Sequence, residues 1–268
     1  MTKILNKITQ NSANNKRYYQ KYNRGYKEFI EGKSFHKIFY EVLKLIKKWS
    51  KFQILDVGCG RGEVIYLAAK NGYRGYGIDN SPEAVNLSLR YKHLLSKKEK
   101  SNYIIKKMDA KNLKFKNGYF DTVLALDITE HLYDRELEEF LREANRVLCS
   151  NGKLIIHTPN SIIMKPAIFI ANLIGIKLIM QDFHVNEKDI KSLEKILQPY
   201  FKIEKKWFEK EKNFWSGITI NRGLLIRSIA WIMDKIFDNH FVDSLIRKSF
   251  LFNFFGNGIW IVGTKLPY

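Results

Sequence analysis

Cysteine and proline are scarce in this chain of 268 residues, which holds two of the first and five of the second. Cys59 and Cys149 are far apart and show no Cys-x-x-Cys spacing, which argues against a disulfide framework and a cysteine-based zinc site. The first ten residues mix lysines with single apolar residues and show no secretory signal pattern. These absences predict a protein of the reducing cytoplasm.

Acidic residues are also few, with 27 Asp and Glu against 46 Lys and Arg, so the formal net charge is +19. A basic surface binds nucleic acid, anionic lipid or an acidic substrate. The lysines are nevertheless spread along the whole chain and accompany many Asn and Ile residues, as an AT-rich coding sequence produces without selection for a partner. The charge therefore leaves a functional and a compositional origin open.

A continuous apolar run of membrane-spanning length is missing as well. Residues 161–180 are strongly apolar, but they are interrupted by Lys165, Pro166, Asn172, Gly175 and Lys177. A spanning helix needs ~20 largely apolar residues. We therefore do not expect a transmembrane helix in this segment.

Strand and helix patterns alternate from residue 52 onward. Strands are expected at 53–57, 75–78, 103–107, 120–126, 153–157, 201–208 and 258–265. Helices are expected from Ser34 to about Trp49, after the Ser81 N-cap, up to Asn151-Gly152, and from the Asn186 N-cap to Leu197. This order predicts an α/β fold with a doubly wound, seven-stranded, mainly parallel sheet.

The expected domain covers residues 34–268 and follows a tyrosine-rich arm or lid at residues 1–33. Helical insertions are expected in the carboxyl-terminal third, at about 161–185 and 209–257. No repeat or Gly/Ser linker divides the chain, and no pattern indicates an oligomeric state.

A glycine-rich turn follows the first predicted strand. Asp56 is the next-to-last residue of this strand, and Gly58, Gly60 and Gly62 follow before a helix begins. Asp56, Gly58 and Gly60 are expected to belong to a cofactor site. Glycine lets the backbone approach a ligand closely, at the strand ends where doubly wound sheets bind ligands. Dinucleotide-binding loops carry a glycine where this chain has Glu63. An acid there disfavours a pyrophosphate, whereas a cofactor with sulfonium and ammonium groups tolerates it.

Acids also end the next two strands. Asp79, followed by Asn80, lies 21 residues after Gly58, the spacing at which a carboxylate meets ribose hydroxyls in such folds. Asp109 and Ala110 follow the third strand, where they are placed to receive an adenine amino group. For both acids the alternative is an ordinary turn residue.

These features resemble the class I S-adenosylmethionine-dependent methyltransferases, and most of all the group with quinone-biosynthesis O-methyltransferases. The resemblance covers about residues 35–208 and adds to the glycines and acids above Phe120-Asp121-Thr122-Val123-Leu124, Glu130-His131-Leu132, Val147-Leu148 and Asn151-Gly152-Lys153-Leu154. It implies that S-adenosylmethionine is the cofactor, with Gly58 and Gly60 along its methionine and ribose and Asp79 on the ribose diol. It also implies that Asp109 and Ala110 flank the adenine and that Leu126 and Asp127 border the methionine end.

Methyl transfer to an oxygen acceptor, which we favour, also needs a base. His131 after the fourth strand is the candidate general base, and a structural role at a helix start is the alternative. A metal held by Glu130, His131 and His184 is conceivable, but no spacing signature supports it and we expect none. His157, Asn160 and His184 are expected to line the acceptor pocket.

The acceptor is expected to be a small, hydrophobic or lipid-linked molecule. The two insertions are rich in apolar residues and add Trp215, Arg222, Arg227, Trp231, Arg247 and Lys248, which suit a peripheral contact with a membrane. Core helices of a larger cap are the alternative. An RNA methyltransferase is less expected, because Asp127-Ile128-Thr129-Glu130 stands where many base methyltransferases have Asp-Pro-Pro-Tyr/Phe. A non-catalytic cofactor-binding module is the third alternative.

Overall fold

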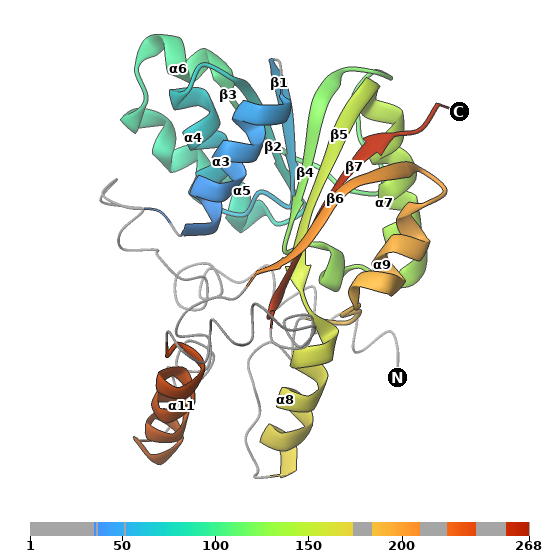
Figure 1. The fold of residues 1–268 in the computed structure, drawn as a ribbon. Helices are drawn as coiled ribbons and strands as arrows, with labels where there is room; N and C mark the ends of the chain where they lie inside the picture. Colours follow the sequence, from blue (N-terminus) through green and yellow to red (C-terminus); the bar gives the residue numbers. More distant parts are fainter. Residues whose placement is uncertain are drawn as a thin grey trace.

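A seven-stranded sheet forms the centre of the protein, with helices on both of its faces (Figure 1). The computed structural model describes residues 35, 37–50, 52–173, 184–209, 224–239 and 256–267. The strand order is β3-β2-β1-β4-β5-β7-β6. The strands are β1 (Gln53–Val57), β2 (Arg74–Asp79), β3 (Tyr103–Lys107), β4 (Phe120–Leu126), β5 (Leu148–Pro159), β6 (Phe201–Glu209) and β7 (Gly258–Lys265).

The sheet is mainly parallel, as the sequence predicts. Strand β1 pairs in parallel with β2 and β4, β2 with β3, and β4 with β5. Strand β7 pairs antiparallel with both β5 and β6. The carboxyl ends of β1, β2, β3, β4 and β5 therefore meet at one edge, where ligands bind in open α/β sheets.

Helices cover the two faces because each has one apolar side. Helices α3 (Lys37–Trp49), α4 (Glu63–Lys70), α5 (Pro82–Arg90) and α6 (Lys97–Asn102) lie on one side, and α7 (Asp134–Val147) and α9 (Ile190–Leu197) on the other (Figure 1). The predicted stripe of α7 is confirmed, since Leu137, Phe140 and Leu141 are buried. The predicted N-cap Ser81 also holds, because its Oγ accepts the N–H of Ala84.

Three predicted helix limits are wrong. Helix α3 begins at Lys37 rather than Ser34. Helix α7 ends at Val147, and Asn151-Gly152 instead lies inside β5, where Asn151 has a φ of 61° and the pairing with β4 shifts.

The third error concerns α9, whose N-cap is Asp189 rather than Asn186. Asp189 accepts the N–H of Ser192. The Asn186 amide instead donates to the carbonyl of Leu132, 2.9 Å away. The side chain of Asn186 is therefore used for a tertiary contact, and the cap falls to the next suitable acceptor.

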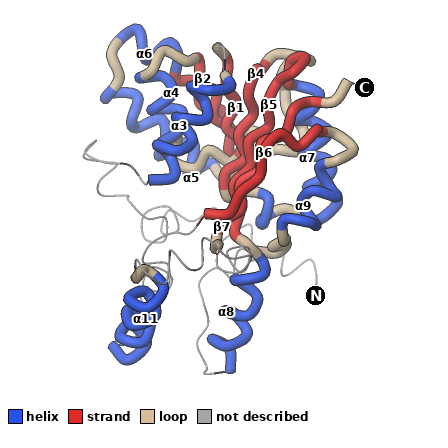
Figure 2. The backbone as a smooth tube through the Cα atoms, in the orientation of Figure 1, coloured by secondary structure: helices blue, strands red, loops and turns tan. Residues whose placement is uncertain are grey.

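Each predicted insertion contains one described helix. Helix α8 (Ser161–Leu173) and helix α11 (Leu224–Phe237) extend from the sheet at the same end of the molecule (Figures 1 and 2). Within the described ranges no helix has the length and apolar character to cross a membrane. The predicted arm at residues 1–33 lies outside the described residues, as do Trp215, Arg222, Arg247 and Lys248.

Candidate functional site

The glycine-rich turn joins β1 to α4 and is fastened to β2. The N–H groups of Gly58 and Cys59 both donate to the carbonyl of Ile78. Gly58 has a φ of 74°, and a Cβ there would lie 2.7 Å from Cδ1 of Ile128. Gly60 also lies in the left-handed region, at 51°. The glycines of this turn therefore hold a backbone conformation that other residues could adopt only with strain.

Asp79 connects the turn to the end of β2. Its Oδ2 accepts the N–H of Gly60 at 3.0 Å, and its Oδ1 accepts the N–H of Ser81 at 2.8 Å. Burial raises the pKa of this carboxyl, and the two N–H donors partly oppose that rise. Each carboxylate oxygen keeps a second acceptor site for a hydroxyl. The neighbouring Asn80 is exposed.

A buried ion pair lies under the same turn. The Arg61 guanidinium contacts Oε1 of Glu63, with Nε at 2.6 Å, and only 1% and 6% of the two side chains are exposed. The charge of Glu63 is thus balanced within the loop, so the expected repulsion of a pyrophosphate by Glu63 does not hold. The loop still differs from a dinucleotide-binding loop in its size at this position, because Glu63 replaces a glycine.

Asp56 lies beneath the turn rather than on its surface. It is 3% exposed. Burial raises its pKa well above the usual range, and the charges of Glu63 and Asp79 raise it further. We therefore expect Asp56 to influence cofactor binding indirectly, by supporting the glycine-rich loop.

The segment after β3 lies against Asp79. The N–H of Met108 donates to the backbone carbonyl of Asp79. Asp109 accepts the N–H of Lys111 at 2.9 Å and lies 3.5 Å from its ammonium group. Ala110 is buried. The structure thus brings Asp109 and Asp79 to one edge, and the adenine contact stays a prediction.

At the end of β4, Leu126 is half-buried and Asp127 pairs with His157 of β5. The Asp127 Oδ1 lies 2.6 Å from Nδ1 of His157, and the Asp127 N–H donates to the His157 carbonyl. Asp127 has a φ of 52°, an uncommon conformation that turns its side chain toward β5. The sequence placed both residues at strand ends but did not reveal that they form a pair.

The charges of this pair shift both pKa values. Burial lowers the pKa of His157, but the charge and hydrogen bond of Asp127 outweigh it and the net pKa is raised. Half of the Asp127 side chain is exposed, so desolvation raises its pKa little, and the charge and hydrogen bond of His157 lower the net pKa. The His157 ring also packs on Trp260, with centroids 4.6 Å apart. His157 is therefore an anchored cation below its raised pKa.

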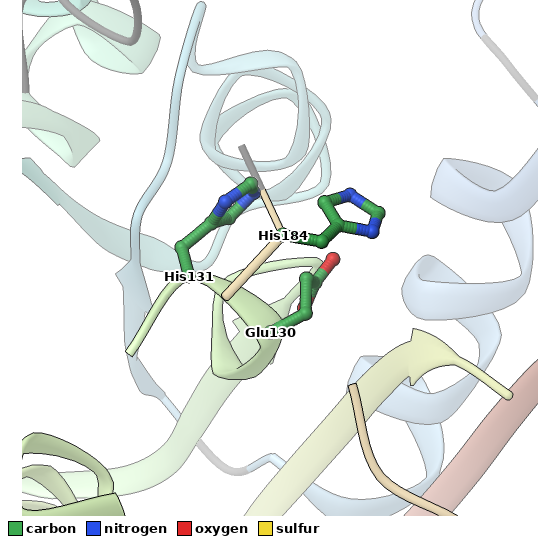
Figure 3. Close-up of side chains that lie close together, drawn as sticks. All are labelled: Glu130, His131 and His184. Carbon is green, nitrogen blue, oxygen red and sulfur yellow. The ribbon is translucent and has the colours of Figure 1, made fainter. Parts of the chain in front are cut away.

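A cluster of two histidines and one glutamate lies beside the His157–Asp127 pair. Glu130 and His131 belong to the short helix Thr129–His131 that follows β4, and His184 precedes α9. Figure 3 shows the three side chains side by side, with the two rings 5.2 Å apart between centroids. Burial, with the charge of Asp127, raises the pKa of Glu130 to about 7. The structure brings together the three residues that the sequence named as a conceivable but unexpected metal set.

Comparison with known proteins identifies the domain that carries these features. Residues 55–156 match the family described as "Methyltransferase domain". A magnesium protoporphyrin IX methyltransferase from Synechocystis PCC 6803, solved with bound SAH, has a TM-score of 0.58 at 15% identity, covering 86% of this chain and 83% of that one. Residues 55–156 therefore form a methyltransferase domain, and the fold of the chain is that of the class I methyltransferases. S-adenosylmethionine is the cofactor of this domain.

Two relatives resemble the same region. Norajmaline N-methyltransferase of Rauvolfia serpentina is 35% identical over 104 residues, which are 38% of this chain and 34% of that protein. Ubiquinone biosynthesis O-methyltransferase of Pelagibacter ubique is 28% identical over 153 residues, 57% and 58% of the two chains. The chain thus spans less than two thirds of either relative.

One residue expected in the acceptor pocket of the methyltransferase domain has a structural task. Asn160 is fully buried. Its Nδ2 donates to the carbonyl of Gly256 at 2.8 Å, and its N–H donates to that of Asn257. Asn160 therefore fastens the start of β7 to the start of α8. Its place beside an acceptor stays a prediction.

The His157–Asp127 pair is expected to make stability depend on pH. A raised histidine pKa contributes stability below the unfolded value of about 6.5, and this contribution disappears as the pH rises through the folded pKa. Between pH 6 and pH 9 the wild-type domain should therefore lose more stability than Asp127→Asn does. Urea denaturation at both pH values measures this difference, and equal losses would contradict the coupling.

Proposed function

We propose that the protein transfers a methyl group from S-adenosylmethionine to an oxygen of a small, hydrophobic or lipid-linked acceptor. The observation that carries this proposal is the placement of two groups at one sheet edge. The glycine turn and Asp79 lie at the ends of β1 and β2, and the cluster of Glu130, His131 and His184 follows β4. A cofactor site and a proton-accepting site therefore adjoin.

The cofactor supplies a methyl group already activated on a sulfonium, so the chain mainly positions the reactants. Asp79 is proposed to accept hydrogen bonds from the ribose diol while it keeps the Gly60 turn in place. Asp109 is proposed to receive the adenine amino group, and Leu126 with Asp127 to border the methionine end. Ground-state contacts of this kind place the methyl carbon in line with the acceptor.

For an oxygen acceptor, the cluster after β4 is proposed to remove the hydroxyl proton. His131 is the proposed base, because a histidine changes its charge near neutral pH. The presence of this base favours oxygen as the atom that receives the methyl group, because a hydroxyl must lose its proton. The two relatives described above are named as an N- and an O-methyltransferase, so their names support either atom.

An apolar acceptor is supported by the two projecting helices. Large apolar side chains that are at least one-third exposed on α8 and α11 are Ile162, Phe169, Leu173, Trp231, Ile232 and Ile236. Cationic side chains accompany them, among them Lys165 and Arg227. Together with the net charge of +19, this combination supports peripheral contact with an anionic lipid surface. Salt-sensitive binding to anionic vesicles tests it, and no binding at low salt would exclude it.

Replacement of Asp79 by alanine is expected to weaken S-adenosylmethionine binding by about 1–3 kcal/mol, because a charged hydrogen-bond partner is lost. Calorimetry with S-adenosylmethionine and its demethylated product measures this change, and NAD serves as the comparison ligand. Asp121→Ala is the matched control, since Asp121 also accepts two backbone N–H groups, from Phe52 and Gln53, at the amino ends of the strands. Equal weakening in both variants would show a loss of folding rather than of a ligand contact.

The acceptor class is tested by following a labelled methyl group. The proposal expects the label in the organic-soluble fraction of a lipid extract and not in RNA. Label in RNA would overturn the proposed acceptor. Intact cofactor affinity without any transfer would support a non-catalytic module instead.

A further inference from the structure

The cluster of Glu130, His131 and His184 has the composition of a metal site. One possible ligand atom from each of the three residues lies within 4.8 Å of the other two. Glu130 and His131 come from the turn after β4, whereas His184 lies more than fifty residues later in the chain. Figure 3 shows the three side chains grouped over the short helix Thr129–His131. Two imidazoles and one carboxylate form a ligand set used by catalytic zinc sites.

Backbone hydrogen bonds hold the two segments together. The N–H groups of Val185 and Asn186 both donate to the carbonyl of Glu130, at 2.9 and 3.0 Å. The Asn186 side chain adds a bond to the carbonyl of Leu132. The segment that carries His184 is thus held next to Glu130 by the main chain.

Neighbouring groups orient two of the three ligands. The Nδ1 of His184 lies 2.7 Å from Oε1 of Glu187, whose side chain is 6% exposed. With Nδ1 engaged, Nε2 is the ring nitrogen of His184 that we expect to bind a cation. The hydroxyl of Thr158 donates to Oε2 of Glu130 at 3.1 Å. Carboxylate–histidine pairs and bonded carboxylates of this kind are the usual second layer around a bound metal.

We propose that Glu130, His131 and His184 bind one divalent transition-metal ion, with zinc as the preferred probe. Ligands at about 2.1 Å around a tetrahedral ion lie about 3.4 Å apart. Atoms that lie up to 4.8 Å apart must therefore come closer by up to about 1.4 Å when the ion binds. Three protein ligands leave at least one coordination position for another molecule.

The chemical role of the ion rests on the proposed function, although its binding does not. An acceptor hydroxyl in the open position would have its pKa lowered by the ion, as a bound water does. Its proton passes to water, the oxygen forms a bond to the methyl carbon, and the carbon–sulfur bond breaks to leave a neutral thioether. In this arrangement His131 binds the ion, and water takes the proton-accepting role that His131 has in the metal-free form of the proposed reaction.

Calorimetry of the EDTA-treated full chain with Zn²⁺, Mn²⁺ and Mg²⁺ tests the site. We expect one Zn²⁺ per chain. His184→Ala should weaken binding at least a hundredfold, and Glu187→Gln should weaken it about 10–100-fold, as is usual for a group that orients a ligand. The control is His93→Ala, because His93 is an exposed histidine outside the cluster and its loss should leave affinity unchanged.

The S-adenosylmethionine affinity of each variant shows whether the domain is folded. Absence of stoichiometric binding by the folded wild type, or equal loss in His93→Ala and His184→Ala, would overturn the proposal. Co²⁺ should give visible absorption bands in the wild type that His184→Ala removes. If Zn²⁺ binds but EDTA leaves methyl transfer unchanged, the site stands and its role in the reaction is refuted, without affecting the proposed function.

Discussion

Glu63→Ala is expected to lower the free energy of unfolding by about 3–5 kcal/mol, because it leaves the Arg61 guanidinium buried without its carboxylate. Both side chains are almost completely buried beneath the glycine turn, and Arg61 contacts Glu63 through two of its nitrogen atoms. A guanidinium remains charged at all accessible pH values, so the domain cannot avoid the cost by deprotonation. Urea denaturation at neutral pH measures the change.

The matched control is Glu139→Ala on α7. Glu139 also pairs with an arginine, Arg135, but this arginine is largely exposed. Exposed pairs contribute only ~0.3–0.5 kcal/mol. A loss of the same size in both variants would mean that water or another group compensates Arg61, and the structural assignment of the buried pair would then be wrong.

Gly62→Ala is expected to destabilise the domain by about 2–5 kcal/mol. Gly62 has a φ of 79°, and left-handed backbone costs about 1–2 kcal/mol for other residues. A Cβ would also lie 2.5 Å from the hydroxyl of Tyr103, which donates to the carbonyl of Ser88 at 2.9 Å. Displacing this buried hydroxyl adds about 1–3 kcal/mol. Thermal and urea denaturation measure the total.

Gly72→Ala separates the two contributions. Gly72 has a φ of 85°, but nothing lies within 4 Å of the position of an added Cβ. Its substitution should therefore carry the backbone cost alone, about 1–2 kcal/mol. If the two variants lose the same stability, the Tyr103 contact contributes nothing.

The sheet was predictable from the sequence because its strands are short, apolar and clearly bounded. The limits of β1, β3, β4 and β7 coincide with those expected. Helix starts were less predictable, since several residues compete for each cap. Asn186 and Asp189 are both good N-caps in isolation, and the tertiary bond from Asn186 to Leu132 decides between them.

The sequence predicts which residues lie at the ends of strands, but it does not predict which side chains contact one another. The acids at residues 79, 109 and 127 follow strands, so their shared edge follows from a parallel sheet. The pairing of Arg61 with Glu63 depends on a turn geometry that residue order does not reveal. The position of His184 depends on backbone bonds to Glu130, and no local pattern encodes those bonds.

The antiparallel strand β7 lies between β5 and β6, and 48 residues, 210–257, separate it from β6. Loop-closure entropy grows slowly, by about 0.6 kcal/mol for each doubling of length. Shortening this connection fourfold or lengthening it twofold therefore changes stability by only about 1 kcal/mol from chain entropy. We therefore expect that the connection between β6 and β7 can be replaced by segments of different length and composition. The sheet and its cofactor edge should stay unchanged.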